Sequence, residues 1–133
     1  MKVDNIDIVT EIATAGYAIA VNLGPGSVDY SHSTYPGVWQ ELYVKEGLHF
    51  GDPIIIHAMR NEPGKSRWSE IAVPDSMNVL ERAHQFGMRF GAVVWLPNAR
   101  GFMSILTAAR SDREFSDAEL EALETSLKKV VET

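Results

Sequence analysis

The chain has 133 residues, of which 45% are hydrophobic and 23% are charged, and these proportions are ordinary for a globular protein. This length predicts one domain over residues 1–133 that buries roughly two-thirds of its unfolded surface. A net charge of -6 argues against binding of nucleic acid, and the lack of cysteine excludes disulfides, thiolate metal sites and thiol nucleophiles.

Apolar periodicity and turn residues predict the elements that follow. In chain order they are a helix over 6–15, a hairpin of strands 17–23 and 28–33, helices over 36–46, 54–60 and 74–87, a hairpin of strands 92–96 and 102–109, and a helix over 116–131. Residues 66–73 are expected to form a loop or short helix. Hairpins imply an antiparallel sheet, and the helices between them imply layers on its faces. We therefore expect an α+β fold, specifically an αβα sandwich.

Four local signals support these boundaries. Gly24-Pro25-Gly26 is a strong turn signal between the first two strands. Pro36 suits the first position of a helix, and Asp52-Pro53 has the order of an N-cap followed by proline at that position. Ser116-Asp117-Ala118-Glu119 has the pattern of a capping box, which opens the last helix.

Three aromatic residues, Tyr35, Trp39 and Tyr43, recur at intervals of four and so share one face of the predicted helix. An aromatic core stripe would have the same spacing. Three buried N–H or O–H groups on one face are costly to satisfy with protein alone, which favours a pocket. Asp52 is either an N-cap alone or also an acceptor for a ligand amide. Trp68, in a polar segment, is either a plug over the core or a pocket wall.

Little in the sequence indicates an enzyme or a metal site. The four histidines (His32, His49, His57 and His84) are scattered and show no metal-ligand spacing. No nucleophile elbow, Walker A loop or dinucleotide fingerprint is present. The chain also lacks a signal peptide and any apolar run long enough to span a bilayer. We expect a soluble, cytoplasmic protein that is not an enzyme, with no metal, no cofactor and no membrane partner.

Taken together, these features resemble the autoinducer-binding domain of LuxR-type quorum-sensing regulators, over most of the chain from about Gly16 to the last helix. The most specific parts are Tyr35-x3-Trp39-x3-Tyr43 and Asp52-Pro53, followed by Trp68-Ser69, the run from Ala83 to Gly91 and the run from Gly101 to Thr107. The resemblance implies an αβα sandwich with a central antiparallel sheet of about five strands. It also implies an N-acyl-homoserine lactone, or a similar amphiphile, between the sheet and the helices on one face.

The same resemblance assigns roles to individual residues. Trp39 would donate its indole N–H to the lactone carbonyl, and Asp52 would accept from the ligand amide. Tyr35 and Thr107 would serve the acyl carbonyl or a 3-substituent. Tyr43 and Trp68 would be apolar walls. Ser104 is a further pocket candidate.

The family's regulators carry a helix-turn-helix domain after this region, whereas the sequence ends at Thr133. As an excised domain it would be the sensing half of a transcription factor. As a complete protein it would be a ligand sink, or an antagonist that forms heterodimers with a full-length LuxR-type regulator, with or without ligand. The leucine stripe of the last helix, over residues 120–131, would then serve as the surface of a homodimer or heterodimer, or would simply cover the sheet.

Overall fold

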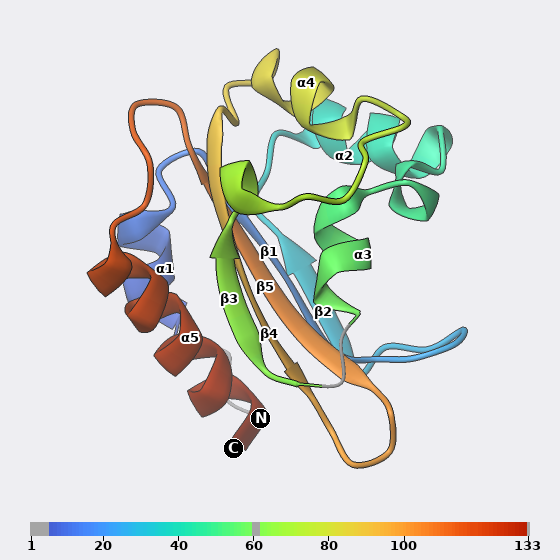
Figure 1. The fold of residues 1–133 in the computed structure, drawn as a ribbon, viewed down its shortest axis with the longest axis vertical. Coiled ribbons are helices and arrows are strands. Elements are labelled where there is room, and N and C mark those ends of the chain that lie inside the picture. The colour runs from blue at the N-terminus through green and yellow to red at the C-terminus, as the bar shows by residue number, and fades with distance from the viewer. Residues whose placement is uncertain (1–5, 60–61, 133) are drawn as a thin grey trace.

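The computed structural model describes residues 6–59 and 62–132 and shows a twisted sheet with helices on both faces (Figure 1). The strands are β1 (Tyr17–Leu23), β2 (Tyr30–Ser33), β3 (Gly64–Arg67), β4 (Phe90–Pro97) and β5 (Met103–Arg110). Their order in the sheet is β2-β1-β5-β4-β3, and each neighbouring pair is antiparallel. The expected α+β sandwich with a five-stranded antiparallel sheet is confirmed.

The helices divide between the two faces of the sheet. They are α1 (Asp7–Ile12), α2 (Gly37–Lys45), α3 (Pro53–Ala58), α4 (Val79–His84) and α5 (Asp117–Glu132), with short 3-10 helices η2 (Leu48–Phe50) and η3 (Trp68–Glu70). Helices α1 and α5 lie on one face, and α2, α3 and α4 lie on the other (Figure 1). Among the described residues, none of these helices combines the length and apolar character needed to cross a membrane.

The core beneath α1 and α5 accounts for the leucine stripe. Leu120, Leu123 and Leu127 are buried and share a cluster with Val94 and Leu106 of the sheet. Of the two uses expected for the stripe, it therefore covers the sheet of its own chain. These leucines are not exposed as a dimer surface, which corrects that part of the expectation.

A second core lies beneath α2, α3 and α4. It includes Trp39, Trp68, Val93 and Ile105. Successive residues of a strand point to opposite faces, so β5 directs Ile105 into this core and Leu106 into the other. The sheet thus separates two layers with different contents, and the aromatic stripe belongs to the second layer.

Local capping signals were predicted correctly where they depend only on neighbours. The Asp52 carboxylate accepts from the Ile54 backbone N–H at 2.9 Å, and Pro53 is the first residue of α3. In the capping box, the Ser116 N–H donates to Glu119 at 2.9 Å and the Glu119 N–H donates to the Ser116 hydroxyl at 3.2 Å.

The observed boundaries of several helices and strands differ from the predicted ones, and most of these elements are shorter than predicted. Helix 6–15 shrinks to α1, strand 28–33 to β2, and Pro36 lies before α2 instead of within it. Helix 54–60 ends at Ala58, and its predicted last residue, Arg60, lies outside the described residues. Strands 92–96 and 102–109 each shift or extend by one or two residues.

The predicted helix over 74–87 is reduced to α4. Asn78 has a φ of 54°, in the left-handed region that a continuous helix does not adopt. The Asp75 carboxylate instead accepts from the backbone N–H groups of Val79 and Leu80, at 2.8 and 2.9 Å, and so caps a helix that begins after it.

Strand β3 was missed entirely, because a turn was expected up to Gly64 and a loop or short helix over residues 66–73; a short helix, η3, does follow the strand. Gly64, Lys65, Ser66 and Arg67 show no apolar alternation, and they become a strand by pairing with residues 92–95 of β4. Gly64 is required there because a Cβ would overlap the ring of Trp95.

Candidate ligand-binding cavity

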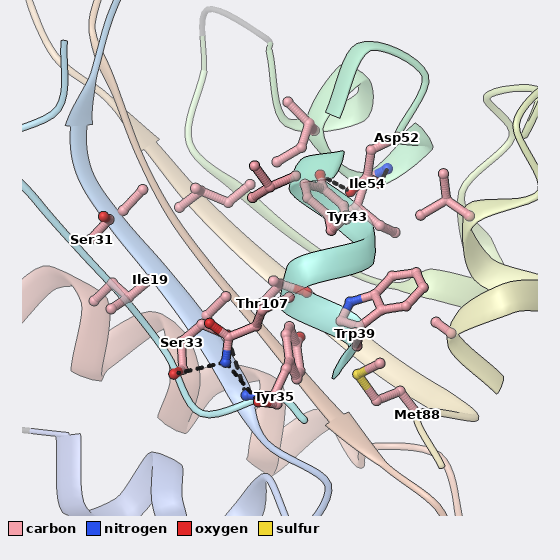
Figure 2. Close-up of a pocket in the computed structure, with 18 of the residues that line it drawn as sticks. Ile19, Ser31, Ser33, Tyr35, Trp39, Tyr43, Asp52, Ile54, Met88 and Thr107 are labelled. Carbon is pink, nitrogen blue, oxygen red and sulfur yellow. Dashed lines mark hydrogen bonds between the residues drawn. The ribbon is translucent and has the colours of Figure 1, made fainter. Parts of the chain in front are cut away.

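A cavity of about 550 Å³ lies between the sheet and the layer that contains α2, α3 and α4. Six of the seven residues selected from the sequence line it: Tyr35, Trp39, Tyr43, Asp52, Trp68 and Thr107. They come from the segments between β2 and α3, from η3 and from β5, and Figure 2 shows five of them converging on one space.

Helix α2 brings two of the aromatic residues to the cavity. Trp39 and Tyr43 are one turn apart, and their ring centroids lie 5.9 Å apart at 59°. Phe86 also packs on Trp39, with ring centroids 5.5 Å apart, and Trp39 is only 5% exposed. None of the described residues accepts a hydrogen bond from the Trp39 N–H, and its nitrogen faces the interior of the cavity (Figure 2). Trp39 therefore offers a free donor.

Tyr35 leads from β2 into α2 and is held by its backbone. Its N–H donates to the Ser33 hydroxyl at 3.2 Å, and its carbonyl accepts from the Gln40 amide at 2.7 Å. Its own hydroxyl is buried and finds no partner among the described residues. Burial raises the pKa of the Tyr35 phenol, and this outweighs the opposing effect of the neighbouring Thr107 hydroxyl. A buried, unpaired hydroxyl is costly unless a ligand completes it.

Asp52 lies at the start of α3 with both carboxylate oxygens engaged. One oxygen accepts from the Ile54 N–H at 2.9 Å, and the other accepts from the Tyr43 hydroxyl at 2.6 Å. Asp52 is 7% exposed, and burial raises the pKa of its carboxyl, although the bonds from Tyr43 and Ile54 lower it in part. A carboxylate has about four acceptor positions, so two remain for a ligand.

Tyr43 was expected only as an apolar wall of the cavity, but its hydroxyl also donates a hydrogen bond to Asp52. Burial raises the pKa of the Tyr43 phenol, and the negative charge of Asp52 raises it further. The phenol thus remains a neutral donor that orients the carboxylate. This hydrogen bond could not be predicted from the spacing of nine residues between Tyr43 and Asp52. It forms only because residues 46–51 turn the chain back toward α2.

Trp68 and Thr107 bind each other across the sheet. The Trp68 indole donates to the Thr107 hydroxyl at 3.0 Å, and that hydroxyl donates to the Ala92 carbonyl at 3.2 Å. The ring of Trp68 rests on Gly91, where any Cβ would overlap it. The hydroxyl of Thr107 has one proton and two lone pairs, so one acceptor position remains beside Tyr35.

Ser104 does not line the cavity, which corrects its place among the candidates. Its hydroxyl accepts from the Asn22 N–H at 3.0 Å. Ser104 and Thr107 are three residues apart on β5, so their side chains point to opposite faces of the sheet. Thr107 and Ile105 face the cavity, whereas Ser104 shares its face with Leu106 and the layer of α1 and α5.

Among the lining residues that were not selected from the sequence, four small ones lie together on β1 and β2, and we call them the small-residue block: Ala18, Ala20, Ser31 and Ser33. They face each other across β1 and β2 in the pairs Ala18–Ser33 and Ala20–Ser31. A signal was available in β1, where the two alanines alternate with bulky Ile19 and Val21. The small side chains leave the sheet uncovered over this area.

The site offers hydrogen bonds and apolar surface. Among the described residues, no group of three or more histidine or acidic side chains could hold a metal ion. Two free donors, at Trp39 and Tyr35, and one buried acceptor, at Asp52, converge on a cavity whose other walls are largely apolar. Such an arrangement suits an uncharged molecule with two or more acceptors and a donor.

Comparison of the chain with known proteins identifies a family and a relative. The model of the autoinducer-binding domain family matches residues 11–130. The HTH-type quorum-sensing regulator RhlR of Pseudomonas aeruginosa is 27% identical over 101 residues, which are 76% of this chain and 42% of RhlR. The chain therefore spans less than half the length of that relative.

Solved structures share the fold at lower identity. The N-acylhomoserine lactone dependent LuxR family transcription factor CepR2 of Burkholderia cenocepacia superposes with a TM-score of 0.74 and 21% identity, covering 96% of this chain and 79% of CepR2. Escherichia coli SdiA in complex with octanoyl-rac-glycerol superposes with a TM-score of 0.71 and 17% identity, covering 99% of this chain and 60% of SdiA.

Proposed function

The chain belongs to the autoinducer-binding domain family, and from this premise we propose that its cavity binds an N-acyl-homoserine lactone as the sensing domain of a LuxR-type quorum-sensing regulator. The observation that carries the proposal is the set of unpaired polar groups in an apolar cavity. These groups are the indole N–H of Trp39, the phenol of Tyr35 and the remaining acceptor positions of Asp52. As part of this proposal we expect a cytoplasmic location.

The functional groups of the lactone match these partners in number and kind. An N-acyl-homoserine lactone has a ring carbonyl, an amide carbonyl and one amide N–H. Trp39 and Tyr35 supply two donors for the carbonyls, and Asp52 supplies an acceptor for the N–H. In this proposal Tyr35 donates to the acyl carbonyl or to a 3-substituent, and the remaining acceptor position of Thr107 takes a hydrogen bond from a 3-hydroxyl group where the ligand has one. Tyr43 holds the Asp52 carboxylate in position, and Trp68 forms a wall.

A glycerol ester is the other amphiphile to test, because SdiA has been solved with octanoyl-rac-glycerol. An ester also has a carbonyl for Trp39 or Tyr35, and a glycerol hydroxyl can donate to Asp52. It lacks the ring and the planar amide, however, so its flexible head group loses more conformational freedom when it pairs with these residues. We therefore expect the lactone to bind more tightly than the glycerol ester of the same acyl chain.

The experiment is titration calorimetry of N-octanoyl-homoserine lactone and octanoyl glycerol into the wild type, Trp39→Phe and Asp52→Asn. Each variant should lose about 1–3 kcal/mol of lactone binding, because one partner in a buried hydrogen bond is removed. Trp95→Phe is the matched control. The Trp95 indole donates to the Glu62 carbonyl at 2.9 Å, away from the cavity, so this variant loses stability but keeps its affinity. Normal lactone binding by both Trp39→Phe and Asp52→Asn would overturn the assignment.

The antagonist function, in which the chain forms heterodimers with a full-length LuxR-type regulator, is the alternative. The burial of the leucine stripe on α5 removes the surface that was expected to support it. Co-elution of this chain with such a regulator in the absence of lactone would favour the antagonist. Absence of any association, with or without lactone, would leave the sensing function alone.

A further inference from the structure

The ligand cavity opens to solvent at one edge of the sheet. Its lining residues on the α4 side, Val79, Ala83 and Met88, are buried and close that end. At the other end, Val44 of α2 is 77% exposed and Leu23 of β1 is 39% exposed, and Ser31 on the edge strand β2 is also exposed. The opening therefore lies between α2 and the β1–β2 edge.

The small-residue block forms the floor that leads to this opening. Thr107 on β5 is paired with Ala18 on β1, and Ala18 is paired with Ser33 on β2. The next row runs from Ile105 through Ala20 to Ser31. Neighbouring strands are about 4.8 Å apart, so the floor extends about 10 Å from β5 to the edge. In these two rows, every residue beyond β5 is an alanine or a serine.

The polar groups of the cavity lie at the inner end of this floor. Figure 2 shows Trp39 and Met88 on one side of the cavity, Ser31 and Ser33 on the opposite side, and Tyr35 and Thr107 between them. The buried, unpaired hydroxyl of Tyr35 marks where the polar part of a ligand ends. Toward the edge, the lining consists of the small-residue block, of Ile19, Leu23 and His32 on β1 and β2, and of Gln40 and Val44 on α2.

We propose that the acyl chain of the ligand runs over the small-residue block and leaves the cavity beside Ser31 and Val44, so that no wall limits its length. This inference rests on the proposed function, because it takes the lactone ring to lie beside Trp39 and Asp52. The specificity-determining positions are then Ala20 and Ser31. They set how well a long chain fits, while short chains end before reaching them.

The experiment compares N-butanoyl- and N-dodecanoyl-homoserine lactone, together with a dodecanoyl lactone that carries a pyrenyl group on its terminal carbon. Titrations use the full chain as wild type, Ala20→Val and Ser31→Val. The wild type should bind the pyrenyl lactone within about threefold of the plain dodecanoyl lactone, because the chain end is in solvent. Both variants should lose about tenfold or more in affinity for the dodecanoyl lactone and keep their affinity for the butanoyl lactone.

Valine is favourable in strands, so both variants should fold, and circular dichroism checks this. Ser27→Val makes the same change in the hairpin turn, outside the cavity, and should affect neither lactone. Rejection of the pyrenyl lactone by the wild type, or equal losses for short and long chains, would overturn the chain path while leaving lactone binding intact. Failure of the wild type to bind any lactone would overturn the proposed function and this inference together.

Discussion

Two tyrosines of the aromatic stripe should respond in opposite directions to the same chemical change. Removing the Tyr35 hydroxyl by Tyr35→Phe deletes a buried group that has no partner among the described residues. Without ligand, this variant should unfold with a free energy about 1 kcal/mol higher than the wild type, at the low end of the cost of an unsatisfied group because Thr107 is close. Tyr43→Phe instead breaks the 2.6 Å bond to Asp52 and leaves a buried carboxylate with one partner fewer. Its free energy of unfolding should fall by about 2 kcal/mol.

Urea unfolding followed by tryptophan fluorescence measures both variants under the same conditions. Saturating N-octanoyl-homoserine lactone should then stabilise Tyr35→Phe less than the wild type by about 1 kcal/mol, because the ligand no longer gains the phenol as a partner. Tyr35→Phe should thus raise the stability of the unliganded protein and lower the stabilisation that the ligand adds. If Tyr35→Phe destabilises the unliganded protein as much as Tyr43→Phe does, then the Tyr35 hydroxyl already has a partner and the reasoning is wrong.

Three further predictions concern the supports of the cavity. Thr107→Val leaves the Trp68 indole unpaired and removes the donor to the Ala92 carbonyl. The free energy of unfolding, measured by thermal denaturation, should therefore fall by about 1–3 kcal/mol. A change of less than about 0.5 kcal/mol would contradict these two hydrogen bonds. Gly91→Ala should displace Trp68, seen as a shift of its fluorescence and as loss of lactone binding, and an unchanged emission spectrum would refute the close contact. The pKa of Asp52 in the folded state lies above its ordinary value of 3.8, so the folded state binds this proton more tightly than the unfolded state does. The stability of the protein therefore falls as the pH rises from the ordinary pKa to the raised pKa of the folded state. The stability of the wild type relative to Asp52→Asn, measured in urea between about pH 4 and about pH 7, should therefore decrease, and a flat or rising difference would contradict it.

Features that depend on adjacent residues could be predicted from the sequence. The Asp52 cap, the capping box at 116–119 and the two hairpins all follow from local preferences, and the structure has each of them. The sharing of one helical face by Trp39 and Tyr43 likewise follows from the period of the α-helix.

Features that depend on distant pairing could not be predicted in this way. Residues 64–67 are a strand only because β4 pairs with them, and nothing in Gly-Lys-Ser-Arg favours a strand. The bond from Tyr43 to Asp52 requires the chain to turn back on itself at 46–51. The leucine stripe of α5 has one pattern and two possible partners, and only the tertiary structure decides between the sheet and another chain.

Strand parity could have excluded one candidate in advance. Thr107 and Ser104 were both selected for the cavity, although an odd separation on one strand places them on opposite faces. The same rule, applied to the alternation of Ala18 and Ala20 with Ile19 and Val21, indicates a face of β1 that nothing bulky covers. Both points needed only the predicted strands and no structure.

The double engagement of Asp52 constrains how this cavity could be re-engineered. Its carboxylate both starts helix α3 through the Ile54 N–H and accepts from Tyr43 inside the cavity. A substitution that altered the polar head group accepted there would also remove a helix cap, unless it retained a side chain able to cap, such as asparagine or serine. Ala20 and Ser31, on the floor of the cavity, cap no helix. Laboratory evolution of this domain should therefore change its specificity for the acyl chain of the ligand much earlier than its specificity for the polar head group.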